Sequence, residues 1–258
     1  MTPSVAAPDV LVLPDAEALA SAVAARLLDR LRQVQAERGD ASVVLTGGSV
    51  GIAVLRAVRD SPDRAAVDWR TVDVWWGDER WVEVDSPDRN DGQAREALLD
   101  HLDLDPARVH PMAWPGGPDG DDPETAADAY AQQLAGAATP GALAPAFDVL
   151  LLGMGPEGHT ASIFPKSPAA HDERAALAVH GCPKPPPTRI SLGFAALTAA
   201  EQVWVVAAGA EKAPMLALAR SGVGRVQVPV AGARGRERTV WLLDEAAAQE
   251  LPPEAYAG

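Results

Sequence analysis

Cysteine, aromatic residues and long apolar runs are scarce in this sequence. Cys182 is the only cysteine among 258 residues, so the chain cannot form an internal disulfide bond. No apolar run approaches the roughly 20 residues that a membrane-spanning helix needs. Residues 1–12 lack the basic segment and apolar core of a secretory signal. We therefore expect a cytoplasmic protein that does not contact membranes.

Motifs of several common catalytic sites are also missing. No histidine, cysteine or carboxylate residues have the spacing of metal ligands. Neither the G-K-[ST] end of a nucleotide phosphate loop nor the G-x-S-x-G turn of a serine hydrolase occurs. We expect neither a metal ion nor a cofactor.

Basic residues are fewer than acidic ones. The chain has 22 lysine and arginine residues against 36 aspartate and glutamate residues, a net charge of -14. Nucleic acids and anionic membranes are bound mainly through cationic patches, so neither is an expected partner. A small anionic substrate is compatible with this net charge if a few cationic side chains and backbone N–H groups lie close together at its site.

What the sequence does contain is an alternation of short apolar runs and amphipathic segments. Strands are predicted at Val10–Leu13, Ser42–Leu45, Val72–Trp76, Phe147–Leu152, Ala176–His180, Arg189–Leu192, Val203–Ala207 and Thr239–Leu243. Helices are predicted from Pro14 to Gly39, after Ser49 through Arg59, and at Gly92–Leu102, Glu124–Ala137, Glu211–Arg220 and after Glu245. This alternation indicates a single α/β domain, residues 1–258, with a mainly parallel sheet flanked by helices on both faces.

Three predicted strands end in glycine-bearing turns, directly after Leu45, Trp76 and Leu152. The carboxyl ends of parallel strands lie at one edge of a sheet, where ligands bind in this fold class. We therefore expect the three turns to meet at a common site.

The first turn is Thr46–Ser49, between a strand and a helix. Its glycines Gly47 and Gly48 let several N–H groups point outward together, and the following helix adds partial positive charge. A phosphate or carboxylate would fit there. An ordinary turn with Ser49 as the helix N-cap is an equally good interpretation of these residues alone.

The second turn, Gly77–Arg80, follows a strand that ends in two tryptophans. Arg80 could hold a phosphate through two parallel hydrogen bonds, with Asp78 or Glu79 fixing its orientation. A solvated charged turn is the better default for four such residues in isolation. Trp75 and Trp76 are expected in the core.

The third turn places His159 directly after three closely spaced glycines. Histidine exchanges a proton near neutral pH, so His159 could be a general base that activates water. The alternative is a histidine at a helix start, bonded to nearby backbone. The other four histidines have simple structural explanations.

Gly153, Gly155 and Gly158 also fit the G-x-G-x-x-G pattern of dinucleotide-binding folds. That pattern requires a helix after the third glycine, yet Pro165 would stop one. It also requires an acidic residue at the end of the next strand, whereas Asp172 and Glu173 precede it. We reject this interpretation.

Two further cations stand at element ends. Arg189 opens a strand after a proline-rich stretch, and Lys212 follows Gly209 at a strand-to-helix junction. By default each would be a surface charge.

In chain order, these segments resemble the 6-phosphogluconolactonase family. The matching residues are LTGGS at 45–49, GDER at 77–80, Asn90 before AREALL at 94–99, GMGPEGHTASIFP at 153–165, KPPPTRISL at 184–192, and Gly209 with Lys212. The family usually has aspartate where this chain has Glu157, and often threonine and proline where it has Val50 and Gly51.

The resemblance implies a modified Rossmann-type fold, similar to that of the glucosamine-6-phosphate deaminases. It implies hydrolysis of 6-phospho-D-glucono-1,5-lactone in the oxidative pentose phosphate pathway by a monomer or small homo-oligomer. The implied site residues are His159 as base, with Arg80, Lys212 and the Gly47–Ser49 backbone on the phosphate and Arg189 as a further candidate. The N–H groups of Gly155 and Gly158 are candidates for the oxyanion, and the roles of Glu157 and Asn90 stay open.

Two rival functions remain. A deaminase or isomerase of amino-sugar phosphates should need carboxylates close to His159, but none follows before Asp172. A sugar-phosphate-binding regulator should need a basic DNA-binding segment, which this acidic chain lacks.

Overall fold

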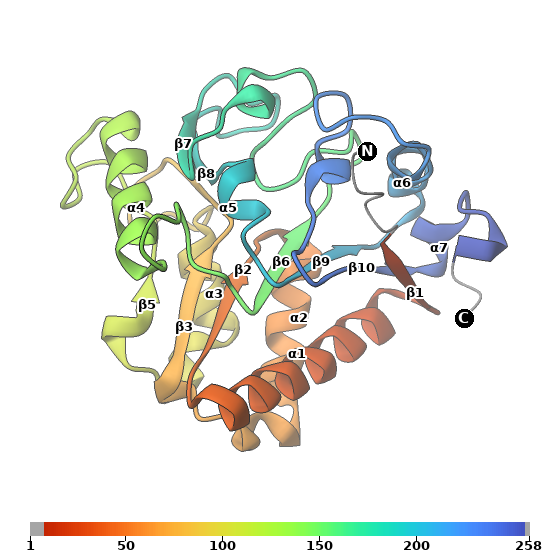
Figure 1. The fold of residues 1–258 in the computed structure, drawn as a ribbon, viewed down its shortest axis with the longest axis horizontal. Helices are drawn as coiled ribbons and strands as arrows, with labels where there is room; N and C mark the ends of the chain where they lie inside the picture. Colours follow the sequence, from red (N-terminus) through yellow and green to blue (C-terminus); the bar gives the residue numbers. More distant parts are fainter. Residues whose placement is uncertain (1–7, 256–258) are drawn as a thin grey trace.

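The computed structural model describes residues 8–255, and its centre is a seven-stranded sheet whose strands are all parallel (Figure 1). In spatial order the strands are β1 (Asp9–Leu13), β10 (Arg238–Asp244), β9 (Gln202–Ala207), β6 (Val149–Gly153), β2 (Ala41–Leu45), β3 (Val72–Trp76) and β5 (Val109–His110). The inner strands are buried almost throughout, as expected for a sheet covered on both faces. The expected α/β fold is confirmed.

Helices flank this sheet. They are α1 (Ala16–Arg38), α2 (Gly48–Asp60), α3 (Asn90–Ala97), α4 (Pro123–Ala137), α5 (Phe194–Leu197), α6 (Ala213–Arg220) and α7 (Glu245–Ala248). Short 3-10 turns cover Pro62–Ala66, Trp69–Thr71, Leu99–His101, Pro106–Arg108, Pro168–His171, Ala210–Lys212, Pro229–Gly232 and Pro253–Ala255. Figure 1 shows α1 and α2 below the sheet, where they contact each other and several strands.

Local sequence signals explain most of the helix ends. Asp15 caps α1 by accepting a hydrogen bond from the N–H of Ala18 at 2.8 Å, and Gly39 ends it with φ of 89°. The helix expected at Gly92–Leu102 is shorter, because Leu98 leaves the helical region and a separate 3-10 turn follows. This break buries both Leu98 and Leu99.

A second, antiparallel sheet was not anticipated. It contains β4 (Asp78–Arg80), β8 (Arg189–Leu192) and β7 (Ala176–Val179), and α4 packs against it. The two later strands were predicted, although not as a separate sheet, whereas residues 78–80 were expected to form a turn. Three charged residues carry no strand pattern, so their pairing with β8 could not be read locally.

Strand order fixes where the site lies. The chain leaves β2 toward β3 on one side and leaves β6 toward β9 on the other, although β2 and β6 are neighbours. Such a reversal opens a crevice beyond the carboxyl ends of the two strands. The turns that follow β2 and β6 are the ones that the sequence singled out.

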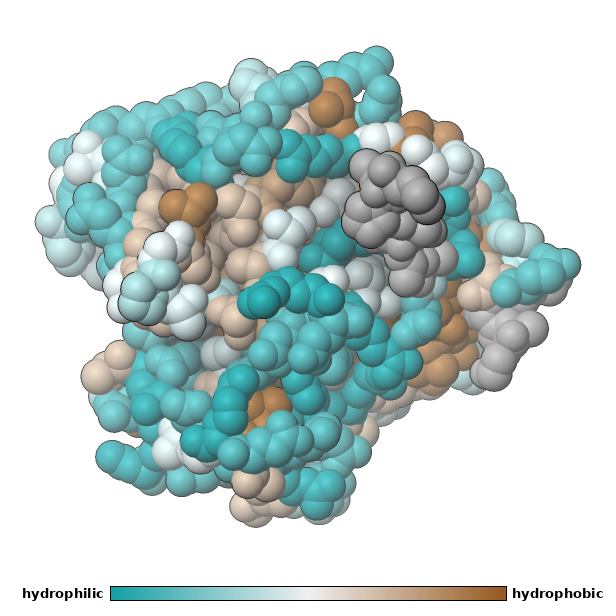
Figure 2. All heavy atoms as spheres, in the orientation of Figure 1, coloured by the Kyte–Doolittle hydropathy of each residue, from teal (hydrophilic) through white to brown (hydrophobic). Residues whose placement is uncertain are grey.

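Among residues 8–255, no helix has both the length and the apolar character needed to cross a bilayer. The face shown in Figure 2 is mostly hydrophilic, and its apolar residues lie in small separate patches. Four of the seven tryptophans, Trp75, Trp76, Trp204 and Trp241, are fully buried, as expected for the first two.

Candidate active site

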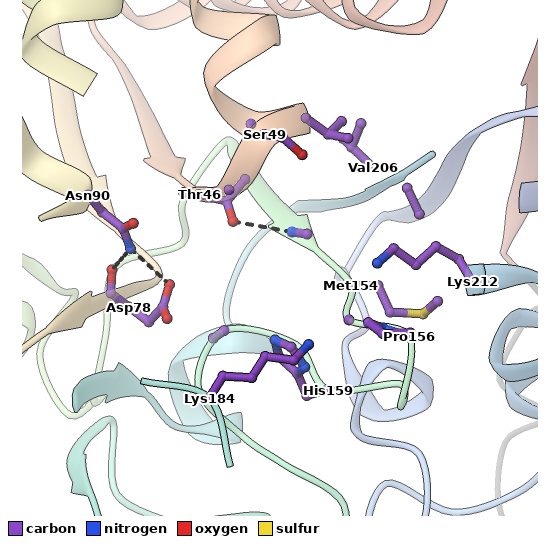
Figure 3. A pocket seen from close by; sticks show the side chains of 18 of the residues that line it. Thr46, Ser49, Asp78, Asn90, Met154, Pro156, His159, Lys184, Val206 and Lys212 are labelled. Carbon is purple, nitrogen blue, oxygen red and sulfur yellow. Dashed lines mark hydrogen bonds between the residues drawn. The ribbon is translucent and has the colours of Figure 1, made fainter. Parts of the chain in front are cut away.

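A cavity of about 250 Å³ opens at this crevice. Its walls come from the turns after β2 and β6, from β4, from the proline-rich segment before β8 and from the turn before α6 (Figure 3). Four cationic side chains line it: Arg80, Lys184, Arg189 and Lys212. The three glycine-bearing turns therefore do meet at one site, and this acidic protein concentrates positive charge there.

The N-terminus of α2 forms one wall. Gly47 is the N-cap residue, and no side chain caps the helix. The first N–H groups of a helix have no partner within it, so those of Gly48 and Ser49 suit an anion. Ser49 lies inside the first turn, so its interpretation as the N-cap was wrong. A Cβ atom on Gly47 would overlap the Asn90 side chain, which explains the glycine.

Arg80 lies beside this helix and is held by Asp88 and by Asn90, whose role the sequence left open. Its Nη1 donates to the carbonyl oxygen of Asp88 and to Oδ1 of Asn90, both at 2.7 Å. Asp78 and Glu79 do not orient its guanidinium, contrary to expectation. Asn90 itself donates to the backbone oxygen of Asp78 at 2.8 Å. Asn90 thus links α3 to the arginine and to β4.

Glu79 is the buried anchor of this wall, with an exposed fraction of 1%. Its carboxylate accepts hydrogen bonds from the backbone N–H groups of Arg80, Asn90 and Asp91 and lies 3.5 Å from the fully buried Arg89. Burial raises the pKa of Glu79, although these partners oppose the rise. The solvated charged turn expected at 77–80 was therefore wrong, and Arg89 was missed.

His159 lies on the opposite side of the cavity (Figure 3). Its Nδ1 is 3.1 Å from Oε1 of Glu157, and its ring stacks on Phe164 with centroids 4.4 Å apart. A Cβ atom on Gly155 would overlap the ring, so the glycine lets the histidine lie against the backbone. Burial lowers the pKa of His159, and the Glu157 carboxylate partly opposes this. The imidazole is therefore largely neutral near pH 7, as a base must be.

The loop that carries His159 is tied by its own backbone. The N–H of Gly155 donates to the carbonyl of His159 at 3.1 Å, and the N–H of Gly158 donates to the carbonyl of Gly155 at 2.9 Å. We expected these two N–H groups to donate to an oxyanion, but both already donate to carbonyl groups of the loop. Gly158 has φ of 84°, in the region that favours glycine. No helix follows it, in agreement with the rejection of a dinucleotide site.

Lys184 approaches the same carboxylate from the proline-rich segment. Its Nζ lies 3.1 Å from Oε2 of Glu157, so Lys184 and His159 contact the two oxygens of one carboxylate. Partial burial acts to raise the pKa of Glu157, but its own backbone N–H, His159 and Lys184 outweigh this and lower it. The sequence placed Lys184 in the proline-rich motif but indicated no role for it.

Arg189 is not a surface charge, since its side chain is only 7% exposed. It donates through Nε to the carbonyl of Pro186 at 3.3 Å and through Nη2 to those of Lys184 and Pro185 at 3.1 and 3.4 Å. Its Nη1 lies 3.8 Å from Oδ2 of Asp78. Arg189 thus connects β8 to the proline-rich segment and to β4.

Lys212 reaches the cavity from the turn before α6, and in Figure 3 its ammonium points into it. The side chain is 16% exposed, and its Nζ lies 3.4 Å from Oε1 of the more exposed Glu211. Among the described residues, no group of histidine, cysteine and carboxylate side chains is arranged to hold a metal ion. The residues that the sequence suggested for catalysis and for binding substrate all line this one cavity, with the exception of Gly158.

Comparisons with known proteins show which family this chain resembles. Residues 14–241 match the model of the family described as glucosamine-6-phosphate isomerases/6-phosphogluconolactonase. The chain is 54% identical to a 6-phosphogluconolactonase of Streptomyces coelicolor over 252 residues, covering 96% of this chain and 97% of the relative.

Solved structures give the same result. The structure of 6-phosphogluconolactonase from Trypanosoma brucei superposes with a TM-score of 0.83 at 28% identity, covering 95% of this chain and 99% of that one. A monomeric glucosamine-6-phosphate deaminase has a TM-score of 0.76 over 94% of this chain and 99% of that one, and at 18% identity this likeness concerns the fold alone.

Proposed function

The chain belongs to the glucosamine-6-phosphate isomerase/6-phosphogluconolactonase family, and we propose that it hydrolyses 6-phospho-D-glucono-1,5-lactone to 6-phosphogluconate. This reaction belongs to the oxidative pentose phosphate pathway. The observation that carries the proposal is one cavity with an uncapped helix N-terminus on one wall and a carboxylate-paired histidine on the other. The first suits a phosphate and the second suits the activation of water.

The phosphate binds at the α2 end. The free N–H groups of the first helical turn, including those of Gly48 and Ser49, direct partial positive charge to it. Arg80 and Lys212 supply full positive charges from two sides. Because Asn90 and the carbonyl of Asp88 already hold Nη1 of Arg80, the guanidinium is oriented before substrate arrives.

His159 acts as the general base. The carboxylate beside Nδ1 favours the tautomer that carries its proton there, which leaves Nε2 to accept a proton. A water molecule loses that proton to His159 as its oxygen bonds to C1 of the lactone. The tetrahedral intermediate then breaks its bond between C1 and the ring oxygen, and the proton on His159 passes to that oxygen. The products are a carboxylic acid, which ionises, and a hydroxyl group.

Glu157 positions His159 rather than exchanging protons itself. Its lowered pKa keeps it ionised at neutral pH, so it stabilises the imidazolium that forms while water attacks. A lactone is an activated ester, so one base with a positioned water can supply the ~10²–10⁴-fold that general-base catalysis typically provides.

The direct test is the hydrolysis of freshly prepared 6-phosphogluconolactone, measured as acid release and compared with its spontaneous rate. We expect a large acceleration with this substrate and none with glucosamine 6-phosphate. Unphosphorylated gluconolactone should react with a much higher KM, because the α2 end would be empty. Deamination of glucosamine 6-phosphate, without lactone hydrolysis, would assign the chain to the other activity of its family.

A further inference from the structure

Lysine is rare in this chain, and its placement is selective. The sequence has three lysines, Lys166, Lys184 and Lys212, and the last two line the cavity. Lys212 belongs to the α2 end. Lys184 instead lies at the opposite end, along the His159 side chain, as Figure 3 shows. Both residues contact the Glu157 carboxylate at 3.1 Å.

The position of Lys184 is built by the protein rather than left to a flexible loop. Arg189 donates to the backbone carbonyls of Lys184, Pro185 and Pro186 and is itself nearly inaccessible. Asp78 lies against its third nitrogen and accepts a 2.6 Å hydrogen bond from Ser162. Arg189 therefore fixes the backbone of the segment that carries one exposed lysine through three hydrogen bonds, and these bonds together with Asp78 leave it little capacity for a phosphate.

The lactone end also requires a hydrogen-bond donor, and the two loop N–H groups expected to supply it are engaged elsewhere. The N–H groups of Gly155 and Gly158 are already used inside the loop. An ammonium group has three N–H donors. One of those on Lys184 serves Glu157, so two remain for the cavity that this side chain lines.

From this geometry we infer that Lys184 stabilises the oxyanion that forms at C1 and then the carboxylate of the product, and that Arg189 positions Lys184 instead of binding phosphate. The inference rests on the proposed lactonase activity. When water adds to C1, the carbonyl oxygen becomes negative, and a fixed cation beside it stabilises the transition state more than the neutral ground state.

The test compares Lys184→Met and Lys184→Arg with the wild-type enzyme. Met preserves the length of the side chain and removes its charge. We expect kcat to fall about 10–100-fold with KM changed less than about threefold, because a charged donor is lost at the reacting oxygen. Arg should restore part of this loss. Lys166→Met removes an exposed lysine outside the cavity and should leave both constants unchanged.

A binding measurement separates the carboxylate end from the phosphate end. We expect Lys184→Met to weaken calorimetric binding of 6-phosphogluconate about tenfold and to leave binding of glucitol 6-phosphate, which lacks the carboxylate, unchanged. Equal weakening of both ligands, or a rise in KM alone, would overturn the inference and make Lys184 a phosphate ligand. Unchanged kcat and binding would overturn it too. Inactive wild-type protein would instead contradict the proposed function itself.

Discussion

The two ends of the cavity are formed by different kinds of chemical group. At the α2 end, the first N–H groups of a helix form the proposed phosphate site, so the helix itself sets its geometry, and Asn90 holds Arg80 beside it. At the other end, the groups proposed to act on the lactone are side chains from two loops: His159, Glu157 and Lys184. Helix N–H groups do not titrate, whereas the protonation of these side chains depends on one another.

Under the proposed function, this difference assigns phosphate binding and chemistry to separate ends of the cavity. Changes at the α2 end should act on KM, because phosphate contacts are the same in the ground state and the transition state. Changes at the His159 end should act on kcat and on its pH dependence. Substitutions at either end test that division.

The largest effect is expected for His159→Ala. Removal of the proposed base should lower kcat about 10²–10⁴-fold, whereas glucitol 6-phosphate should bind as tightly as before. Steady-state kinetics and calorimetry measure the two quantities. His101→Ala, which changes an exposed histidine in the 3-10 turn after α3, is the matched control and should behave as wild type. Near-normal turnover of His159→Ala would refute its role as base.

The same division explains what could be read from the sequence. The turns after β2, β3 and β6 are local signals, since glycine follows an apolar run, and parallel strands must bring such turns together. His159 was proposed as a base because its turn gave no packing reason for a histidine.

Contacts between residues far apart in the chain could not be predicted from the sequence. The burial of Asp78 and Glu79 depends on β8 and Arg89, and the contact between Lys184 and Glu157 joins residues 27 positions apart. Arg189 is an example. The motif indicated a cation available for substrate, whereas in the structure Arg189 contacts three backbone carbonyls and Asp78.

One methyl group placed at each end offers a sharper comparison. In Gly155→Ala the new Cβ overlaps the His159 ring, so the ring must move. A displacement of ~1 Å can cost ~10²-fold in rate, and we expect kcat to fall about 10–100-fold. In Gly47→Ala the Cβ overlaps the Asn90 amide that holds Arg80, so KM should rise about tenfold with a smaller change in kcat.

Gly92→Ala controls for the substitution itself. A Cβ atom on this α3 residue meets open space, so activity should be unchanged and the free energy of unfolding should rise by about 0.5–1 kcal/mol. Thermal unfolding of all three variants checks that they fold. The division fails if Gly155→Ala alters only KM or if Gly47→Ala alters only kcat.

The smallest effect on kcat is expected for Glu157→Gln. The informative result is the direction in which this substitution shifts the pH profile. A charged acceptor is worth about 1 kcal/mol more than a neutral one, so kcat should fall only about fivefold. The carboxylate raises the pKa of His159 against the lowering by burial, and Lys184 and Asp78 are the other charges that act on this ring. Removing the carboxylate charge should therefore lower that pKa and move the acid limb of the kcat/KM profile to lower pH.

Lys184→Met should move the same limb the opposite way, because a positive charge near the imidazolium is lost. Opposite shifts from two substitutions on one carboxylate–ammonium contact would place both charges at the base and not at the phosphate. A shift of the same sign in both variants, or no shift in either, would show that the acid limb does not report His159.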